Sequence, residues 1–394
     1  ARALLTAAGM RLRTGKALVP FRITGNIDWG VPAPPLEDTS DLTVWCWPES
    51  LWAPISFSRA YLEHKGQGIE TLNPTRAAAF AAACANGDEA ALTWQDFWCS
   101  PDAAVFQFIG QDNIYFYGDA QPALWAAQQT GHAPTAQAAP GELQQTTLIA
   151  NYHLLFLDKK ASSSGSIKPP MADELLDHYT PEQLRAHFIA LGLGLKPVSF
   201  QPKPFDPNAN PKAADPALKE GSLLTNVFNR LARSCFYEAQ RSNGGCLPLG
   251  AIEPRFIEEA RKTILAYERC MHRFELHAVS QLVDEYVRTA NKYWADAIKS
   301  AGDDADARKT VLCCAFYQLR VATVLLHPIA PLGTQKVVEY LALGAFEQEF
   351  FSWEHIFEGY EPFVTDAEKS RGGHPLKELP PRSDFFAKHP SQFE

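Results

Sequence analysis

The chain has 394 residues, of which 46% are hydrophobic, enough for two or three domains with cores of their own. The formal net charge of −9 excludes a general nucleic-acid coat protein but allows a local basic face. The absence of an apolar run of eighteen residues predicts that the chain has no membrane span. Eight cysteines without a Cys-x-x-Cys spacing favour a reduced, cytoplasmic protein without a metal site.

The first part of the chain contains two strand signals with polar or aromatic residues beside them. Trp45, Trp47 and Trp52 fall within eight residues after an apolar strand around Val44, and such a cluster is either core or pocket wall. Asp112 follows the apolar strand that contains Phe108-Ile-Gly. An aspartate at the carboxyl end of a parallel strand suits ribose or substrate hydroxyls, and it can equally cap the helix that follows.

A second apolar run, Leu154 to Leu157, is followed by Lys159, Lys160 and a Ser/Gly-rich stretch that ends near Ser166. Two lysines and a glycine between a strand and a helix make a donor-rich loop that suits a nucleotide triphosphate. A solvated loop without a ligand is the alternative. A helix is predicted from Pro181.

The second half of the chain is predicted to be helical. Residues 197–219 hold six prolines, which predicts an inter-domain linker. Beyond it, apolar residues recur at intervals of three and four, as in a helix bundle. The proline-broken tail is expected to pack over the bundle or the loop domain. The helices are predicted over Leu223–Arg233, Pro254–Ala278, Ser280–Lys299, Val311–Leu326 and Gly333–Leu343.

Several of these segments together resemble the class I aminoacyl-tRNA synthetases, and most nearly methionyl-tRNA synthetase. Phe21 to Pro34 resembles the family's R-D-L-D-W-G-x-P-x-P strand, and Phe108 to Tyr117 resembles F-I-G-K-D-I-x-Y-F-H. Lys160 to Ser164 resembles a worn K-M-S-K-S signature, and Leu326 to Pro331 resembles L-x-P-I-x-P. Asn229 and Arg233 match an Asn-x-x-x-Arg pair that contacts the anticodon in the family.

The resemblance implies an α/β fold plus an all-α domain: the second half of a Rossmann-like nucleotide fold, followed by a helical bundle of the anticodon-binding type. The domains expected from it are the catalytic half over 1–150, the loop and connecting domain over 151–196, the linker over 197–221, the bundle over 222–345 and the C-terminal extension over 346–394.

The resemblance also implies roles for individual residues. Those expected to be catalytic, by stabilising pyrophosphate, are Lys159, Lys160, Ser162 and Ser164. Those expected at ATP are Gly110, Asp112 and Lys160. Those expected in the amino-acid pocket are Trp45, Trp52, Phe116 and Tyr117. Those expected at tRNA are Asn229 and Arg233.

The function implied is ATP-dependent activation of an amino acid, with Mg²⁺, and its transfer to tRNA. The chain departs from the pattern where Trp47 replaces an aspartate and Tyr117 replaces a histidine. No His-x-Gly-His tetrad is present, so we expect an N-terminal half to act as a separate chain or an excised segment. Two alternatives stay open: a diverged paralogue that gives the activated amino acid to a small molecule, and a non-catalytic module that binds RNA or protein.

Overall fold

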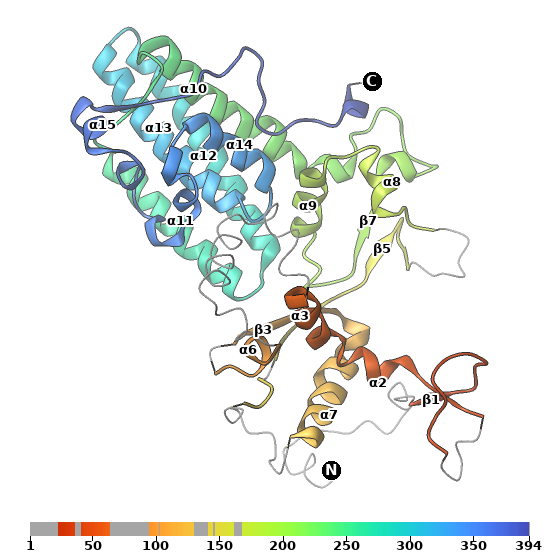
Figure 1. Cartoon of the computed structure of the whole chain (residues 1–394). Helices are drawn as coiled ribbons and strands as arrows, with labels where there is room; N and C mark the ends of the chain where they lie inside the picture. The colour runs from red at the N-terminus through yellow and green to blue at the C-terminus, as the bar shows by residue number, and fades with distance from the viewer. Residues whose placement is uncertain are drawn as a thin grey trace, which may run out of the picture. The chain divides into compact units, whose positions relative to one another are not determined.

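The computed structural model divides the chain into two compact units, Ala1–Asn151 and Tyr152–Glu394, and each is described by itself (Figure 1). The first unit is mixed α/β, and the second joins a small sheet region to a large helical bundle. The residues that the structure describes are 23–35, 41–63, 94–101, 103–129, 141–144, 146–160 and 168–393.

The centre of the first unit is a pair of parallel strands. β3 (Val105–Gly110) and β4 (Thr146–Asn151) pair along their whole length, from Val105 opposite Thr146 to Gly110 opposite Asn151. Parallel strands need a crossover connection, which here contains a 3₁₀ turn (Gln111–Asn113), a π-helix (Tyr115–Ala120) and α7 (Gln121–Gln128). This β-helix-β unit is the arrangement expected from a Rossmann-like nucleotide fold.

Buried groups attach the shorter elements to this pair. The amide of the fully buried Gln121 donates to the carbonyl of Leu51 and accepts from Gln107 on β3, both over 2.8 Å. The aromatic and apolar core beside it contains Ile55, Trp98, Cys99 and Trp125. The shorter elements are β1 (Thr24–Gly25) paired with β2 (Thr43–Val44), α2 (Cys46–Ser50), α3 (Ala53–Glu63) and α6 (Trp94–Trp98).

The second unit begins with a three-stranded sheet in the order β6–β5–β7. β5 (Leu154–Phe156) pairs antiparallel with β6 (Lys159–Lys160) and parallel with β7 (Val198–Phe200). α8 (Ala172–Leu176) and α9 (Pro181–Ala190) lie in the crossover. Thr180 caps α9 by accepting from the Gln183 backbone N–H, and Pro181 occupies the first turn, where a missing N–H costs nothing.

The segment 197–221 is not a free linker, which corrects the prediction from its prolines. It supplies β7, and Phe200 and Ala217 are buried against Phe156 and Tyr179. The Tyr179 hydroxyl donates to Asp215 over 2.6 Å, and burial of the phenol, with Asp215 beside it, raises the pKa of Tyr179. The prolines flank these contacts instead of interrupting them, so the segment completes the connecting region.

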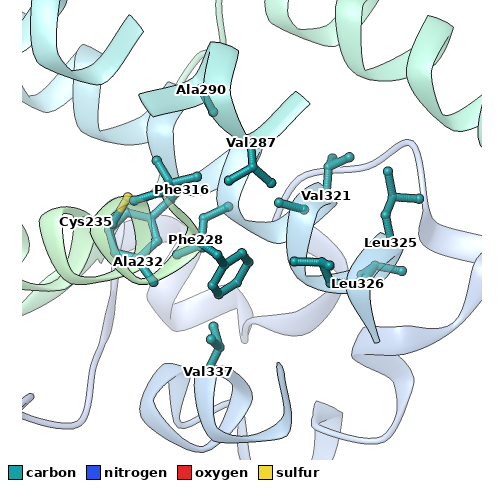
Figure 2. Packing of buried hydrophobic residues seen from close by; sticks show 14 of the residues in the cluster. Phe228, Ala232, Cys235, Val287, Ala290, Phe316, Val321, Leu325, Leu326 and Val337 are labelled. Carbon is teal, nitrogen blue, oxygen red and sulfur yellow. The ribbon is translucent and has the colours of Figure 1, made fainter. Parts of the chain in front are cut away.

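The helical bundle consists of a π-helix, η6 (Leu223–Phe228), and five α-helices that lie side by side in Figure 1. Their side chains interdigitate around Phe228, Phe316 and Val287, as Figure 2 shows. The predicted helix to Ala278 is shorter in the structure because Phe274 takes a positive φ of 59° and turns the chain. The α-helices are α10 (Asn229–Ser242), α11 (Pro254–His272), α12 (Leu276–Ala301), α13 (Ala305–Leu326) and α14 (Pro331–Leu341).

α13 is the central helix of this bundle. Among the described residues it is the one helix long and apolar enough to cross a membrane, but nearly all of its apolar window is buried against its neighbours, as in a core helix. Its fully buried Arg320 donates to the carbonyls of His355 and Glu358 over 2.7 and 2.9 Å. Burial lowers the pKa of this guanidinium, and the carbonyls accept from its two terminal nitrogens in place of water.

The C-terminal extension packs on the bundle. β9 (Gly373–Pro375) pairs antiparallel with β8 (Cys246–Pro248) from the α10–α11 connection. α15 (Asp366–Arg371) is capped by Thr365, whose backbone N–H donates to Glu368, and this bond lowers the pKa of Glu368 to about 2. Short 3₁₀ turns connect these elements at Gly344–Phe346, Glu349–Phe351, Trp353–His355, Glu361–Phe363 and Pro390–Gln392.

Candidate functional site

The carboxyl end of β3 carries Gly110 and Asp112. A Cβ added to Gly110 would lie 2.6 Å from Asp112 Oδ1, so the carboxylate folds back over the glycine into space that only a glycine leaves open. Asp112 is exposed, and it lies in the 3₁₀ turn that leads into the crossover. The exposed carboxylate can therefore accept hydrogen bonds from a hydroxyl-bearing ligand.

An aromatic cluster in the same unit contains two of the four residues predicted for the amino-acid pocket. Trp47 lies between Trp45 and Phe116, with ring centroids 6.3 Å from the first and 4.7 Å from the second. A Cβ on Gly25 would lie 2.8 Å from the Trp45 ring, so the indole rests directly on the glycine backbone. Tyr115 extends the cluster, with its ring 5.4 Å from Phe116.

The other two residues predicted for the pocket lie elsewhere in the unit. Trp52 packs with Trp125, at a centroid distance of 6.3 Å, on the core that contains Trp98. It is partly buried and packs against this core. Tyr117 follows Phe116 in the π-helix and is half-buried.

Trp47 is the aromatic residue that the assignment of the pocket missed. The sequence marked it only as a replacement for the family's aspartate. Its spacing of two residues from Trp45 is no signal, because Trp47 lies inside α2, where residues two apart do not share a face, and only the structure brings the two rings together.

Lys159 and Lys160 form the second strand of a tight hairpin in the second unit. Leu157 and Asp158 make the turn with positive φ values of 47° and 64°. The Asp158 backbone N–H donates to the Ser199 hydroxyl over 2.8 Å, which attaches the turn to β7. Both lysines are exposed and free to meet an anionic ligand. Ser162 and Ser164 lie outside the described residues.

The pair predicted to bind tRNA is held by the C-terminal extension. Asn229 is fully buried, and its Nδ2 donates to the carbonyls of Thr225 and Phe386 over 3.0 and 2.8 Å. Its Oδ1 accepts the backbone N–H groups of Phe385 and Phe386. All four hydrogen-bonding positions of the amide are therefore used, and in this structure Asn229 offers no edge to a base.

Arg233, one turn further along α10, pairs with Asp384 over 2.9 Å, and both side chains are about one-third to two-fifths exposed. Asp384 directly precedes the two buried phenylalanines. Asn229 and Arg233 were predicted to contact RNA. In the structure, residues of the C-terminal extension contact both side chains instead.

The comparisons with known proteins agree with this architecture. The family model described as tRNA synthetases class I (M) matches residues 10–218. The methionine–tRNA ligase of Saccharolobus solfataricus is 26% identical over 344 residues, which are 85% of this chain and 52% of that protein. The enzyme of the same name from Saccharopolyspora erythraea is 26% identical over 82% of this chain and 50% of its own length.

A solved structure shows the same fold. The Mycobacterium tuberculosis methionyl-tRNA synthetase bound by methionyl-adenylate has a TM-score of 0.60 with this chain and 18% identity, covering 93% of this chain and 60% of its own. The chain spans about half the length of the curated relatives it matches. Because the family model covers more than half of the 394 residues, the chain belongs to the class I tRNA synthetases, in the group that contains the methionine–tRNA ligases.

Proposed function

We propose that this chain is part of an ATP-dependent ligase that activates an amino acid as its adenylate and transfers it to tRNA. The observation that carries the proposal is that one unit holds both an exposed carboxylate at the end of a parallel strand and a cluster of aromatic rings. Asp112 and Gly110 provide the nucleotide side, and Trp45, Trp47 and Phe116 provide an apolar wall for an amino-acid side chain.

The residues present suit ATP in a limited set of roles. Asp112, whose carboxylate lies over the backbone of Gly110, accepts from ribose hydroxyls. Lys160 places a positive charge at the departing pyrophosphate. No protein nucleophile is required, because adenylate formation depends on positioning and charge stabilisation. We propose that polypeptide beyond these 394 residues supplies the histidine tetrad, since the matched relatives are about twice as long.

Amino-acid-dependent exchange of pyrophosphate into ATP tests the proposal on the complete enzyme. We expect an amino acid other than methionine to support the fastest exchange. The tryptophan at 47 and the tyrosine at 117 change the walls of the family's pocket, and each misfitted methylene costs about 1–3 kcal/mol. No exchange with any of the twenty amino acids would refute the ligase. Methionine as the best substrate by about a hundredfold would refute the altered specificity alone.

A second candidate is a ligase whose acceptor is a small molecule. The observation that favours it is the occupation of Asn229 and Arg233 by the tail, which closes the pair through which the family contacts the anticodon. Transfer from the preformed adenylate separates the two: tRNA accepts the amino acid in the first case, and small amines accept it in the second. If the enzyme showed neither transfer of the amino acid nor pyrophosphate exchange, the non-catalytic binding module would be the remaining alternative.

A further inference from the structure

A groove of about 640 Å³ runs between α11 and α12 of the helical bundle. Each helix lines it with one face, and on α12 this face carries Leu282, Glu285 and Tyr286, which lie three and four residues apart. Glu259 lines the groove from α11, and Ala266 lies two turns further along the same helix. Two carboxylates, a phenol and apolar side chains therefore share this groove.

The two basic side chains that line the groove already have acidic partners. Lys262 pairs with Glu258 on its own helix over 2.9 Å. Arg255 pairs with Glu253 over 2.9 Å, and its guanidinium also lies 4.6 Å from the centre of the Phe256 ring. Both cations are therefore engaged at α11 and its N-terminus, and they do not fully neutralise the remaining carboxylates of the groove.

These remaining carboxylates, Glu259 and Glu285, belong to different helices and repel each other. Within the part of the chain that the structure describes, neither has a basic side chain at ion-pair distance. Burial raises the pKa of Glu259, Arg255 offsets part of this rise, and the nearby Glu285 adds to it. A cation between the two carboxylates would replace their repulsion by attraction, so the groove favours a positively charged ligand.

The floor of the groove adds a polar group that lacks a partner. Tyr286 is only 3% exposed, and its hydroxyl has no hydrogen-bond partner among the described residues. Burial, with Tyr317 and Glu259 near the phenol, raises the pKa of Tyr286, so the hydroxyl stays neutral. A buried hydroxyl without a partner carries a desolvation cost, and a ligand donor at its oxygen would supply the missing hydrogen bond.

The chemistry of the groove favours an alkylammonium ion over a metal ion. In the described ranges, no group of three or more His, Cys, Asp and Glu side chains is placed to hold a metal. A primary ammonium has three N–H donors, which match three acceptors: the carboxylates of Glu259 and Glu285 and the hydroxyl of Tyr286. Ala266 and Leu282 offer apolar surface that a methylene chain can cover and a hydrated metal ion cannot.

We propose that this groove binds a small aliphatic polyamine, with one primary ammonium held by Glu259, Glu285 and Tyr286 and the methylene chain on the apolar wall. A second ammonium is attracted to Glu258, which lines the same groove and whose exposed pair with Lys262 is weak. The volume of the groove lies within the range of small-molecule sites, about 300–1,000 Å³. The site is independent of the proposed function, because it uses neither ATP nor tRNA.

Isothermal titration calorimetry of the full chain with spermidine, at low ionic strength and without ATP, amino acid or tRNA, tests the groove by itself. The test variant is Glu259→Gln/Glu285→Gln. The matched control is Glu268→Gln/Glu339→Gln, which removes the same charge from exposed positions outside the groove. We expect the test variant to bind spermidine roughly tenfold more weakly, because charge-assisted hydrogen bonds are lost, and the control to bind it as the wild type does.

Tyr286→Phe examines the hydroxyl apart from the ring. We expect this variant to bind spermidine roughly tenfold more weakly as well, since it loses one acceptor of the ammonium. Its midpoint of urea denaturation should be unchanged or higher, because among the described residues the hydroxyl makes no hydrogen bond that the substitution could remove. A lower midpoint with unchanged spermidine binding would show that the hydroxyl is structural and would overturn its role in the site.

Several outcomes would overturn the inference as a whole: equal affinity of the test variant and the wild type, an equal loss in the control variant, equal binding of tetramethylammonium, which has no N–H donor, equal binding of Mg²⁺, or tighter binding of an oligo-lysine peptide. Circular dichroism checks that the variants fold. If the double variant does not fold, Tyr286→Phe decides the question alone. Pyrophosphate exchange is measured separately, so a failure of the ligase proposal and a failure of this site are distinguishable.

Discussion

Asn229 is the residue whose substitution tests the tail contact most directly. Asn229→Ala removes the acceptor for the backbone N–H groups of Phe385 and Phe386 and the donor to the Phe386 carbonyl. Three buried backbone groups then lack partners, and each costs about 1–3 kcal/mol. The alternative is for the tail to detach, which exposes both phenylalanines at about 1.5–3 kcal/mol each. Either route costs about 3 kcal/mol or more.

Native-state hydrogen exchange of a peptide that covers residues 379–388 measures this cost as a loss of opening free energy. Arg233→Gln is the matched control, because its half-exposed pair with Asp384 is expected to contribute less than about 1 kcal/mol. We expect local opening to become easier in Asn229→Ala and to change little in Arg233→Gln. A change below about 1 kcal/mol in Asn229→Ala would refute the reasoning that its amide holds the tail.

Three further predictions concern the nucleotide side and the pH dependence. Lys160→Ala should slow pyrophosphate exchange by about ten- to a hundredfold through loss of a charge-assisted contact of roughly 1.5–3 kcal/mol, and an unchanged rate would show that the hairpin is only structural. Gly110→Ala should raise the KM for ATP, because the added Cβ would lie 2.6 Å from Asp112 Oδ1 and must displace this carboxylate. Gly118→Ala should leave the KM unchanged, because the nearest atom to its added Cβ lies 3.5 Å away. Glu368→Gln should lower stability at neutral pH. The folded pKa of Glu368, about 2, lies below its unfolded value of about 4.3. The difference in unfolding free energy between wild type and variant is therefore fully present above pH 4.3 and is lost as the pH falls towards 2. Urea denaturation of the wild type and of Glu368→Gln between about pH 2 and neutral pH measures this difference. A difference that stays constant with pH would contradict the lowered pKa of Glu368.

Local signals were sufficient for most of the helices and for the β3 turn. The apolar residues predicted α14 to within two residues at each end and the C-terminal end of α13 at Leu326, but α13 begins at Ala305, six residues before the predicted start. The motif around Gly110 and Asp112 also lies where it was expected, at the carboxyl end of a parallel strand. The Leu157–Asp158 turn could not be anticipated, since Asp158 tolerates a positive φ but Leu157 strongly disfavours the one that the hairpin requires.

The sequence by itself determined the class of this protein: its motifs, its helical period and its helix caps are properties of neighbouring residues. Only the tertiary structure decided which candidate residues are accessible. Asn229 and Arg233 have the spacing of an exposed helix face, yet the tail that occupies them is 151 to 157 residues away. The prolines of 197–221 predicted a linker, yet β7 finds its partner in β5. Both outcomes depend on hydrogen bonds between distant segments, and such pairing leaves no periodic signal in either segment alone.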